Sequence, residues 1–168
     1  MERVANEAAL PRPHLYRFFH DKADLVAAVV AAEAAEVNER RRKAVARLPS
    51  FADQIELAIT LVVELVHADE FWSSLVAPST IPYTAYVAAH DPALVASNRG
   101  FWGPLLESGE KKGELRAGLD HGEVMNWLLG LEFLFVERKE LFPTVDDVRH
   151  YVRTFVVPAL VRSESFQS

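Results

Sequence analysis

Residues 11–25 read PRPHLYRFFHDKADL, and this stretch decides how the chain is interpreted. It holds two prolines, two histidines and three aromatic side chains, and a long alanine-rich segment follows it directly. Aromatic side chains are usually well buried, whereas basic ones usually face water or an anion. The stretch must therefore divide its side chains between a packed side and an exposed side.

The patterns around this stretch predict three helices in a row. Residues 2–9 form a short helix that Pro11 ends, and proline suits the first turn of a second short helix over 11–19. Asp21 is the predicted N-cap of a third helix over 22–47, which is rich in strong helix formers. Two short helices joined by a tight turn have helix-turn-helix spacing, in which the second helix lies in the major groove of DNA.

A groove-reading second helix needs an apolar inner side and a polar outer side. Leu15 and Phe19 supply the inner side at spacing i, i+4, with Phe18 also partly in the core. The exposed first turn offers Arg12 and His14 to base edges. The residues expected to grip phosphates are Tyr16, Arg17 and Lys22. Short helix pairs with a solvated basic side are also common, so spacing alone leaves DNA binding open.

The segment VANEAALPRPHLYRFFHDKADLVAAVV, residues 4–30, resembles the DNA-binding signature of the TetR family of one-component transcriptional regulators. The shared features are the alanine-rich helix, the tight turn, the Leu-Tyr-x-x-Phe core from Leu15 to Phe19, and the Lys22 that opens a long helix. The remainder resembles the family only in architecture. The resemblance implies a dimeric repressor that a small molecule releases from its operator, and it adds Pro13 to the residues facing the bases.

Three departures from the family pattern affect this interpretation. The turn position that is usually glycine is Ala9, which must avoid a positive φ or bear its strain. Phe18 stands where the family often has histidine. The family has a helix before the helix-turn-helix pair, and the sequence begins at Met1 inside what would be the second helix. We therefore expect residues 1–26 to be a DNA-binding unit truncated at its N-terminus, and residues 27–168 to be a ligand-binding and dimerisation domain.

Composition places the chain among globular helical proteins. Its 168 residues are half apolar and one quarter charged, and they include no cysteine, which excludes disulfide scaffolds and thiol catalysis. Residues 1–47 carry nine Lys or Arg against seven Asp or Glu, although the whole chain has a net charge of −6, so an anionic partner is expected at the N-terminal end. No secretory signal is evident, and the longest apolar run, 127–136, is too short for a membrane span, so a cytoplasmic protein without membrane partners is expected.

Helical periodicity continues through the rest of the chain and predicts an all-α fold. The central helix, residues 51–68, follows a Ser50 cap and has little polar surface. Further helices are predicted over 70–77, from Asp91 to about residue 112 with a bend at Gly100, Gly103 and Pro104, over 123–141, and over 145–162. Thr144 caps the last helix and Pro158 kinks or frays it. Pro78 and Pro82 bound an irregular link.

Aromatic residues gather in the middle of the chain and suggest a pocket for an apolar small molecule. The residues expected to line it are His67, Phe71, Trp72, Tyr86, Phe101, Trp102, Leu105, Trp127 and Leu131. For any single one of them, ordinary core packing is the preferred interpretation, and only as a group do they indicate a ligand pocket.

The two C-terminal helices are apolar on more than one side, which suggests that one side meets the core and another meets a second subunit. The residues expected at a two-fold interface are Val124, Leu128, Phe135, Val148, Val152, Phe155 and Val156. A tight monomeric bundle is the alternative.

The other charged residues of the sequence do not indicate a second binding site or a catalytic site. The run ERRRK, residues 39–43, is expected to be the solvated end of the long helix. The sequence has no HExxH spacing, Gly-rich phosphate loop or nucleophile elbow, so we expect neither an enzyme nor a cofactor.

The sequence therefore predicts a dimeric regulator that binds double-stranded operator DNA and an apolar effector. The alternative is a helical dimeric ligand-binding or interaction protein without DNA binding.

Overall fold

The computed structural model describes residues 2–75, 87 and 90–162, and their regular elements are helices. One isolated antiparallel bridge joins Leu115 to Val161. The all-α prediction is confirmed. Within these described ranges, no helix combines the length and the apolar character that crossing a membrane requires.

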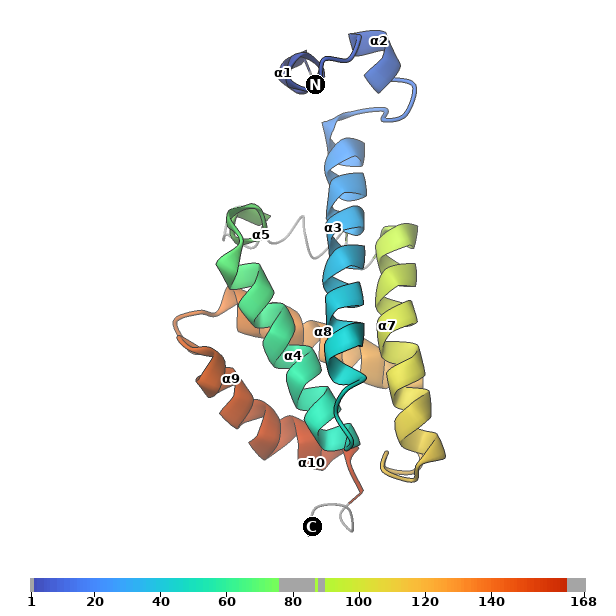
Figure 1. Ribbon diagram of the computed structural model, residues 1–168, viewed down its shortest axis with the longest axis vertical. Helices are drawn as coiled ribbons and strands as arrows, with labels where there is room; N and C mark the ends of the chain where they lie inside the picture. The colour runs from blue at the N-terminus through green and yellow to red at the C-terminus, as the bar shows by residue number, and fades with distance from the viewer. Residues whose placement is uncertain (1, 76–86, 88–89, 163–168) are drawn as a thin grey trace.

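Three elements form the N-terminal part: α1 (Glu2–Glu7), α2 (Arg12–Leu15) and α3 (Lys22–Val45). The short helices α1 and α2 pack on each other at the far end of α3, away from the other helices (Figure 1). Helix α2 is shorter than the predicted 11–19. After one α-turn the backbone tightens, because the amides of Arg17 and Phe18 bond to carbonyls three residues back rather than four.

The remaining helices form a bundle around α4, which contacts α3, α5, α8 and α9, while α3 also packs along α7 (Figure 1). Their bounds are α4 (Phe51–Ala68), α5 (Glu70–Leu75), α7 (Pro92–Lys111), α8 (His121–Glu137), α9 (Val145–Tyr151), the π-helical segment η1 (Val152–Val156) and α10 (Val157–Leu160). Helix α7 is continuous through Pro104. Helix α8 begins two residues earlier and ends four residues earlier than predicted, while the end of the predicted helix 70–77 and the link at Pro78 and Pro82 lie outside the described residues.

Side-chain caps explain why most helix starts were predictable. Asp21, Ser50, Asp91 and Thr144 each accept a hydrogen bond from the backbone N–H three residues further on. These bonds satisfy donors that have no partner inside the helix. At α8 the same role falls to Asp120, which explains why that helix begins at His121.

Around Pro158 the helix changes its hydrogen-bond pattern and continues. Proline has no backbone N–H, so the regular hydrogen-bond pattern fails around it. The amide of Val157 bonds instead to the carbonyl of Val152, five residues back, and residues 152–156 form a π-helical segment. The helix predicted over 145–162 is therefore three consecutive segments: α9, η1 and α10.

Two apolar clusters hold the bundle together. The larger contains the fully buried Phe51, Ile55, Trp102 and Leu128 and joins α4, α7, α8 and the C-terminal segments. The smaller joins the first half of α3 to α5 and α7 and includes Val30, Ala31, Leu75, Val87 and Leu94. Helix α3 therefore connects the N-terminal helix pair to both clusters.

Candidate functional site

The turn between α1 and α2 closes on a complete helix C-cap. The amide of Leu10 bonds to the carbonyl of Ala5 at 2.9 Å, and the amide of Ala9 bonds to Asn6 at 3.2 Å, which is the Schellman pattern. Ala9 has φ 52°, the left-handed conformation that glycine usually supplies. We expected Ala9 either to avoid a positive φ or to bear its strain, and the structure shows the strained conformation.

The helix pair has a small packed side and a broad exposed side. Ala5 and Leu15 are buried and Phe19 is half-buried. Phe18 is 65% exposed and lies beside the His14 ring at a centroid distance of 5.3 Å. The expectation that Phe18 lies partly in the core is therefore wrong, because the chain leaves α2 after one turn and carries this ring outward.

The predicted DNA-binding side chains lie on the exposed side. Pro13, His14, Tyr16 and Arg17 are exposed, as is Lys22, the first residue of α3. The side chain of Arg12 lies outside the described part. Around the junction, Asp21 caps α3, and the backbone amide of His20 donates to Asp24 at 3.0 Å, which fixes the chain where it enters α3. That bond is the main cause of a lowered pKa at the Asp24 carboxyl.

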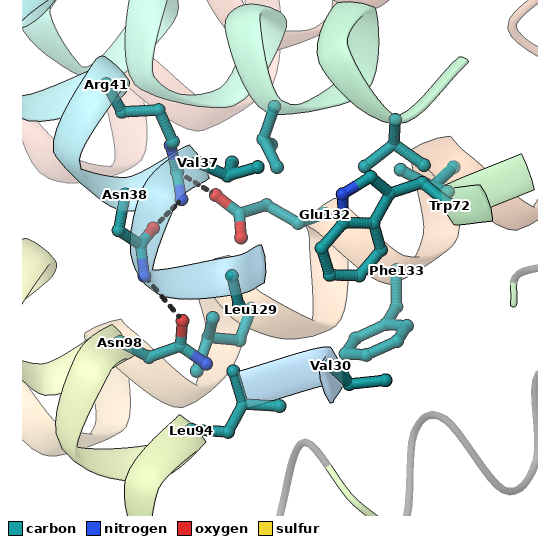
Figure 2. Close-up of a pocket in the computed structure, with 14 residues that line it drawn as sticks. Val30, Val37, Asn38, Arg41, Trp72, Leu94, Asn98, Leu129, Glu132 and Phe133 are labelled. Carbon is teal, nitrogen blue, oxygen red and sulfur yellow. Dashed lines mark hydrogen bonds and ion pairs between the residues drawn. The ribbon is translucent and has the colours of Figure 1, made fainter. Parts of the chain in front are cut away.

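A pocket lies inside the bundle, between α3, α4, α5, α7 and α8 (Figure 2). Its volume is about 100 Å³. Most of its wall is apolar, and the lining residues are Val30, Ala34, Val37, Asn38, Arg41, Val62, Val66, Trp72, Leu94, Asn98, Leu129, Glu132, Phe133 and Val136. One end is polar.

That polar end is a buried network centred on Arg41 of α3. Its Nη1 donates to Asn38 Oδ1 at 2.9 Å, its Nη2 donates to Glu132 Oε1, and its Nε donates to the carbonyl of Ala58 at 2.9 Å. Asn38 Nδ2 in turn donates to Ser97 Oγ at 3.0 Å and to Asn98 Oδ1 at 3.1 Å. The network therefore links α3 to α4, α7 and α8.

Burial makes this ion pair electrostatically costly. The side chains of Arg41 and Glu132 are 2% and 10% exposed. Burial raises the pKa of the Glu132 carboxyl, against the opposing attraction of Arg41, and it lowers the pKa of the Arg41 guanidinium. The guanidinium also lies 4.0 Å from the centroid of the Phe101 ring and 5.2 Å from that of Trp102, so aromatic faces cover part of its charge.

The expectation that residues 39–43 form a solvated run is wrong at one position. Arg40, Arg42 and Lys43 are exposed and pair with glutamates on α3, but Arg41 is completely buried. The signal was present in the spacing, because Val30, Ala34, Val37 and Arg41 recur every three or four residues and lie on the inward side of α3. A second signal was Glu132, the one charged residue within the apolar stretch 124–136.

The residues predicted to line a ligand pocket are distributed over several environments. Trp72 lines the pocket described above, whereas Phe101, Trp102 and Leu105 belong to the larger core cluster. Phe71 and Trp127 are exposed, Leu131 is half-buried, and His67 Nε2 lies 3.4 Å from the carbonyl of Val136. Tyr86 lies outside the described residues.

Of the seven residues predicted at a dimer interface, one is exposed and six are buried. Phe155 is 58% exposed. The other six are buried within this one chain: Val124, Leu128, Phe135, Val148, Val152 and Val156. Two other large apolar side chains on the outside of the C-terminal part are Trp127 on α8 and Leu141 in the segment that follows.

A short helix pair on the end of a long helix, joined to a helical bundle with an apolar pocket, is the architecture expected of TetR-like transcriptional regulators. No protein-family model and no curated protein matches the sequence. Solved structures with the same fold include the fatty acid degradation regulator FadR from Bacillus halodurans, with a TM-score of 0.70 and 12% identity over 92% of this chain and 81% of that chain.

Two further regulators are similar. The transcriptional regulator FadR from Bacillus subtilis, in complex with stearoyl-CoA, has a TM-score of 0.65 and 15% identity over 94% of this chain and 84% of its own. The ketosteroid transcriptional regulator KstR2 of Mycobacterium tuberculosis has a TM-score of 0.60 and 18% identity over 95% and 83%. The resemblance to TetR-like regulators is thus confirmed at the level of the fold.

Proposed function

We propose that this protein is a DNA-binding transcriptional regulator whose DNA affinity responds to a small apolar effector, and that it acts as a dimeric repressor. The observation that carries this proposal is the continuity of α3 from Lys22 to Val45. Lys22 is exposed at the start of α3, directly after the helix pair along the chain, and Asn38 and Arg41 lie at the polar end of the pocket. One helix therefore joins the two candidate sites, roughly 28 Å apart at 1.5 Å per residue.

The proposed coupling follows from this arrangement. The network around Arg41 attaches α3 to three other helices, whereas α1 and α2 pack mainly on each other. A molecule that occupies the pocket changes how α3 packs, and α3 transmits that change to the helix pair. In a dimer, the change alters the spacing of two reading helices and so lowers affinity for an operator with two half-sites.

The pocket also bears on the choice of effector. The FadR from Bacillus subtilis was solved with stearoyl-CoA. The cavity bounded by the described residues of this chain has about 100 Å³, whereas a dry cavity of about 150 Å³ takes up benzene. The effector of this protein is therefore proposed to be more compact than a long acyl chain.

A salt-titrated DNA-binding assay tests the proposed function. The full chain is titrated onto DNA from immediately upstream of its own gene and onto random DNA of equal length. We expect salt-sensitive binding of a dimer that prefers the upstream DNA. Equal binding to both, or none, by a chain that is dimeric in solution would instead favour a ligand-binding dimer without DNA-reading function.

A further inference from the structure

The polar end of the pocket offers a ligand an acceptor on Glu132 and a donor on Asn98, whose Oδ1 is bonded to Asn38 and whose Nδ2 bonds to no other described residue. Arg41 has all three of its nitrogens engaged, by Ala58, Asn38 and Glu132. The amide of Asn38 is engaged through its oxygen by Arg41 and through its nitrogen by Ser97 and Asn98. Glu132 differs, because Arg41 occupies only its Oε1 atom.

The second carboxylate oxygen of Glu132 faces the cavity. Figure 2 shows the Glu132 side chain between Arg41 and the Trp72 ring, with one oxygen directed at Arg41 and the other turned into the space lined by Leu129 and Phe133. A carboxylate oxygen accepts hydrogen bonds and does not donate them. A ligand that reaches this end of the pocket therefore binds more tightly if it carries an N–H or O–H group that can donate to this oxygen.

The charge of Glu132 also excludes a class of occupants. Arg41 donates to Glu132 Oε1 and lies against the Phe101 ring, so its charge is already paired with Glu132. A carboxylate or phosphate ester placed beside Glu132 would set two negative charges side by side against a mostly apolar wall, which is unfavourable. The apolar wall from Val30, Val62, Leu94 and Phe133 requires the rest of the molecule to be hydrocarbon.

We propose that this pocket selects a compact, uncharged apolar molecule with one hydrogen-bond donor, a hydroxyl or N–H group, which it donates to the free carboxylate oxygen of Glu132. This inference rests on the proposed function only in treating the pocket as the effector site. Acidic compounds, including fatty acids, and apolar ketones of the same size are rejected relative to the alcohol. Glu132 is thus the specificity-determining residue of the pocket.

Three four-membered-ring compounds, smaller than benzene, test the proposal: cyclobutanol donates a hydrogen bond, cyclobutanone only accepts one, and cyclobutanecarboxylate is anionic. Binding to the full chain is measured by calorimetry and by tryptophan fluorescence, without DNA. The alcohol can donate to Glu132, whereas the ketone can only accept from a donor such as Asn98. We expect cyclobutanol to bind about tenfold more tightly than cyclobutanone, because a hydrogen bond to a charged group contributes about that factor. The carboxylate should be the weakest. Equal affinity for alcohol and ketone, tightest binding of the carboxylate, or no binding of cyclobutanol up to its solubility limit overturns the proposal.

Two variants tie the selectivity to Glu132. The double variant Arg41→Leu/Glu132→Leu replaces the ion pair by apolar side chains, a change that proteins often tolerate. In it the preference for alcohol over ketone should vanish. If that variant does not fold, Glu132→Gln serves the same purpose, because an amide can donate to the ketone as well as accept from the alcohol, so the two affinities should converge. A preference that persists in the folded variant contradicts the role of Glu132.

The outcome is independent of DNA binding. Selectivity for the alcohol by a protein that fails to bind DNA would leave the pocket chemistry intact and reject the regulator function. Specific DNA binding by a protein with no preference among the three compounds would support the regulator function and reject the proposed pocket chemistry.

Discussion

Phe51, the first residue of α4, covers Gly109 of α7 so closely that a methyl group at Gly109 would lie 2.8 Å from two ring carbons. The ring is completely buried. The amide of Phe51 also donates to Glu114 Oε2 at 2.6 Å, so the start of α4 is held against the C-terminal end of α7 from two directions. The close approach of these two helices depends on the absence of a side chain at Gly109.

Gly109→Ala should therefore destabilise the protein. Overpacking of this kind costs about 1–3 kcal/mol of unfolding free energy. Gly100→Ala is the matched control, because Gly100 lies on the same helix with open space around its Cα and should be neutral or stabilising by up to about 1 kcal/mol. Urea unfolding of both variants measures the difference. Equal effects would show that the ring of Phe51 yields to the methyl group.

The Arg41–Glu132 pair should reveal itself in a double-mutant cycle. Arg41→Leu leaves a buried carboxylate without its partner, and losses of about 3–5 kcal/mol are typical of such changes. Adding Glu132→Leu should restore most of the loss. Arg42→Leu, which removes an exposed partner of Glu39 on the same helix, should change stability by less than about 1 kcal/mol. A double variant no more stable than Arg41→Leu would mean that packing at this site, rather than the unpaired charge, determines the cost.

The positive φ of Ala9 predicts a stabilising substitution. An alanine held in the left-handed region costs about 1 kcal/mol relative to glycine, so Ala9→Gly should stabilise the turn by that order. The exchange rate of the Leu10 amide, which bonds to Ala5, reports this locally and should fall several-fold. Ala8→Gly, next to it on the exposed side, should raise the rate. Faster exchange in Ala9→Gly would contradict the strain.

The proposed phosphate contacts of Tyr16 and Lys22 predict a difference between two variants. Tyr16→Phe and Lys22→Ala should each weaken binding to every DNA sequence, since phosphates carry no sequence information. Only Lys22→Ala removes a charge, so only it should lower the slope of log affinity against log salt, by about one unit per protomer. Lys43→Ala, exposed on α3 at the opposite end, is the charge-matched control and should leave both quantities unchanged. Unchanged binding in both test variants would remove these residues from the DNA interface.

The starts of three helices could be predicted because their causes are local. Asp21, Ser50 and Thr144 each cap a helix through a bond to an amide three residues away, so a short window of sequence contains all the information. Pro158 acts in the same way on the segment before it. Where the local rule was incomplete, as at the tightened turn after Leu15 and at the Asp120 cap of α8, the predicted bounds were wrong.

The polar end of the pocket could not be predicted, because its partners meet only in the folded chain. Arg41 and Glu132 are 91 residues apart, and nothing in the run ERRRK distinguishes the buried arginine except its register on α3. The same difficulty affects helices that are apolar on two sides. Periodicity shows that Leu128 and Phe155 belong to apolar faces, but only packing decides that Leu128 is buried within the chain and that Phe155 is exposed.

That division leads to a prediction about self-association. A dimer interface needs large apolar side chains that the single chain leaves exposed, and Phe155 on η1 meets this requirement at 58% exposure. Phe155→Glu should weaken the proposed dimer at least tenfold, because a truncated and charged anchor at an interface costs about 2 kcal/mol or more. Leu141→Glu is the control, since Leu141 is equally exposed but lies outside α8 and η1. Sedimentation equilibrium of the two variants decides the matter. If Leu141→Glu dissociates the dimer and Phe155→Glu does not, the two-fold contact runs through the segment after α8, and Phe155 is not part of the interface.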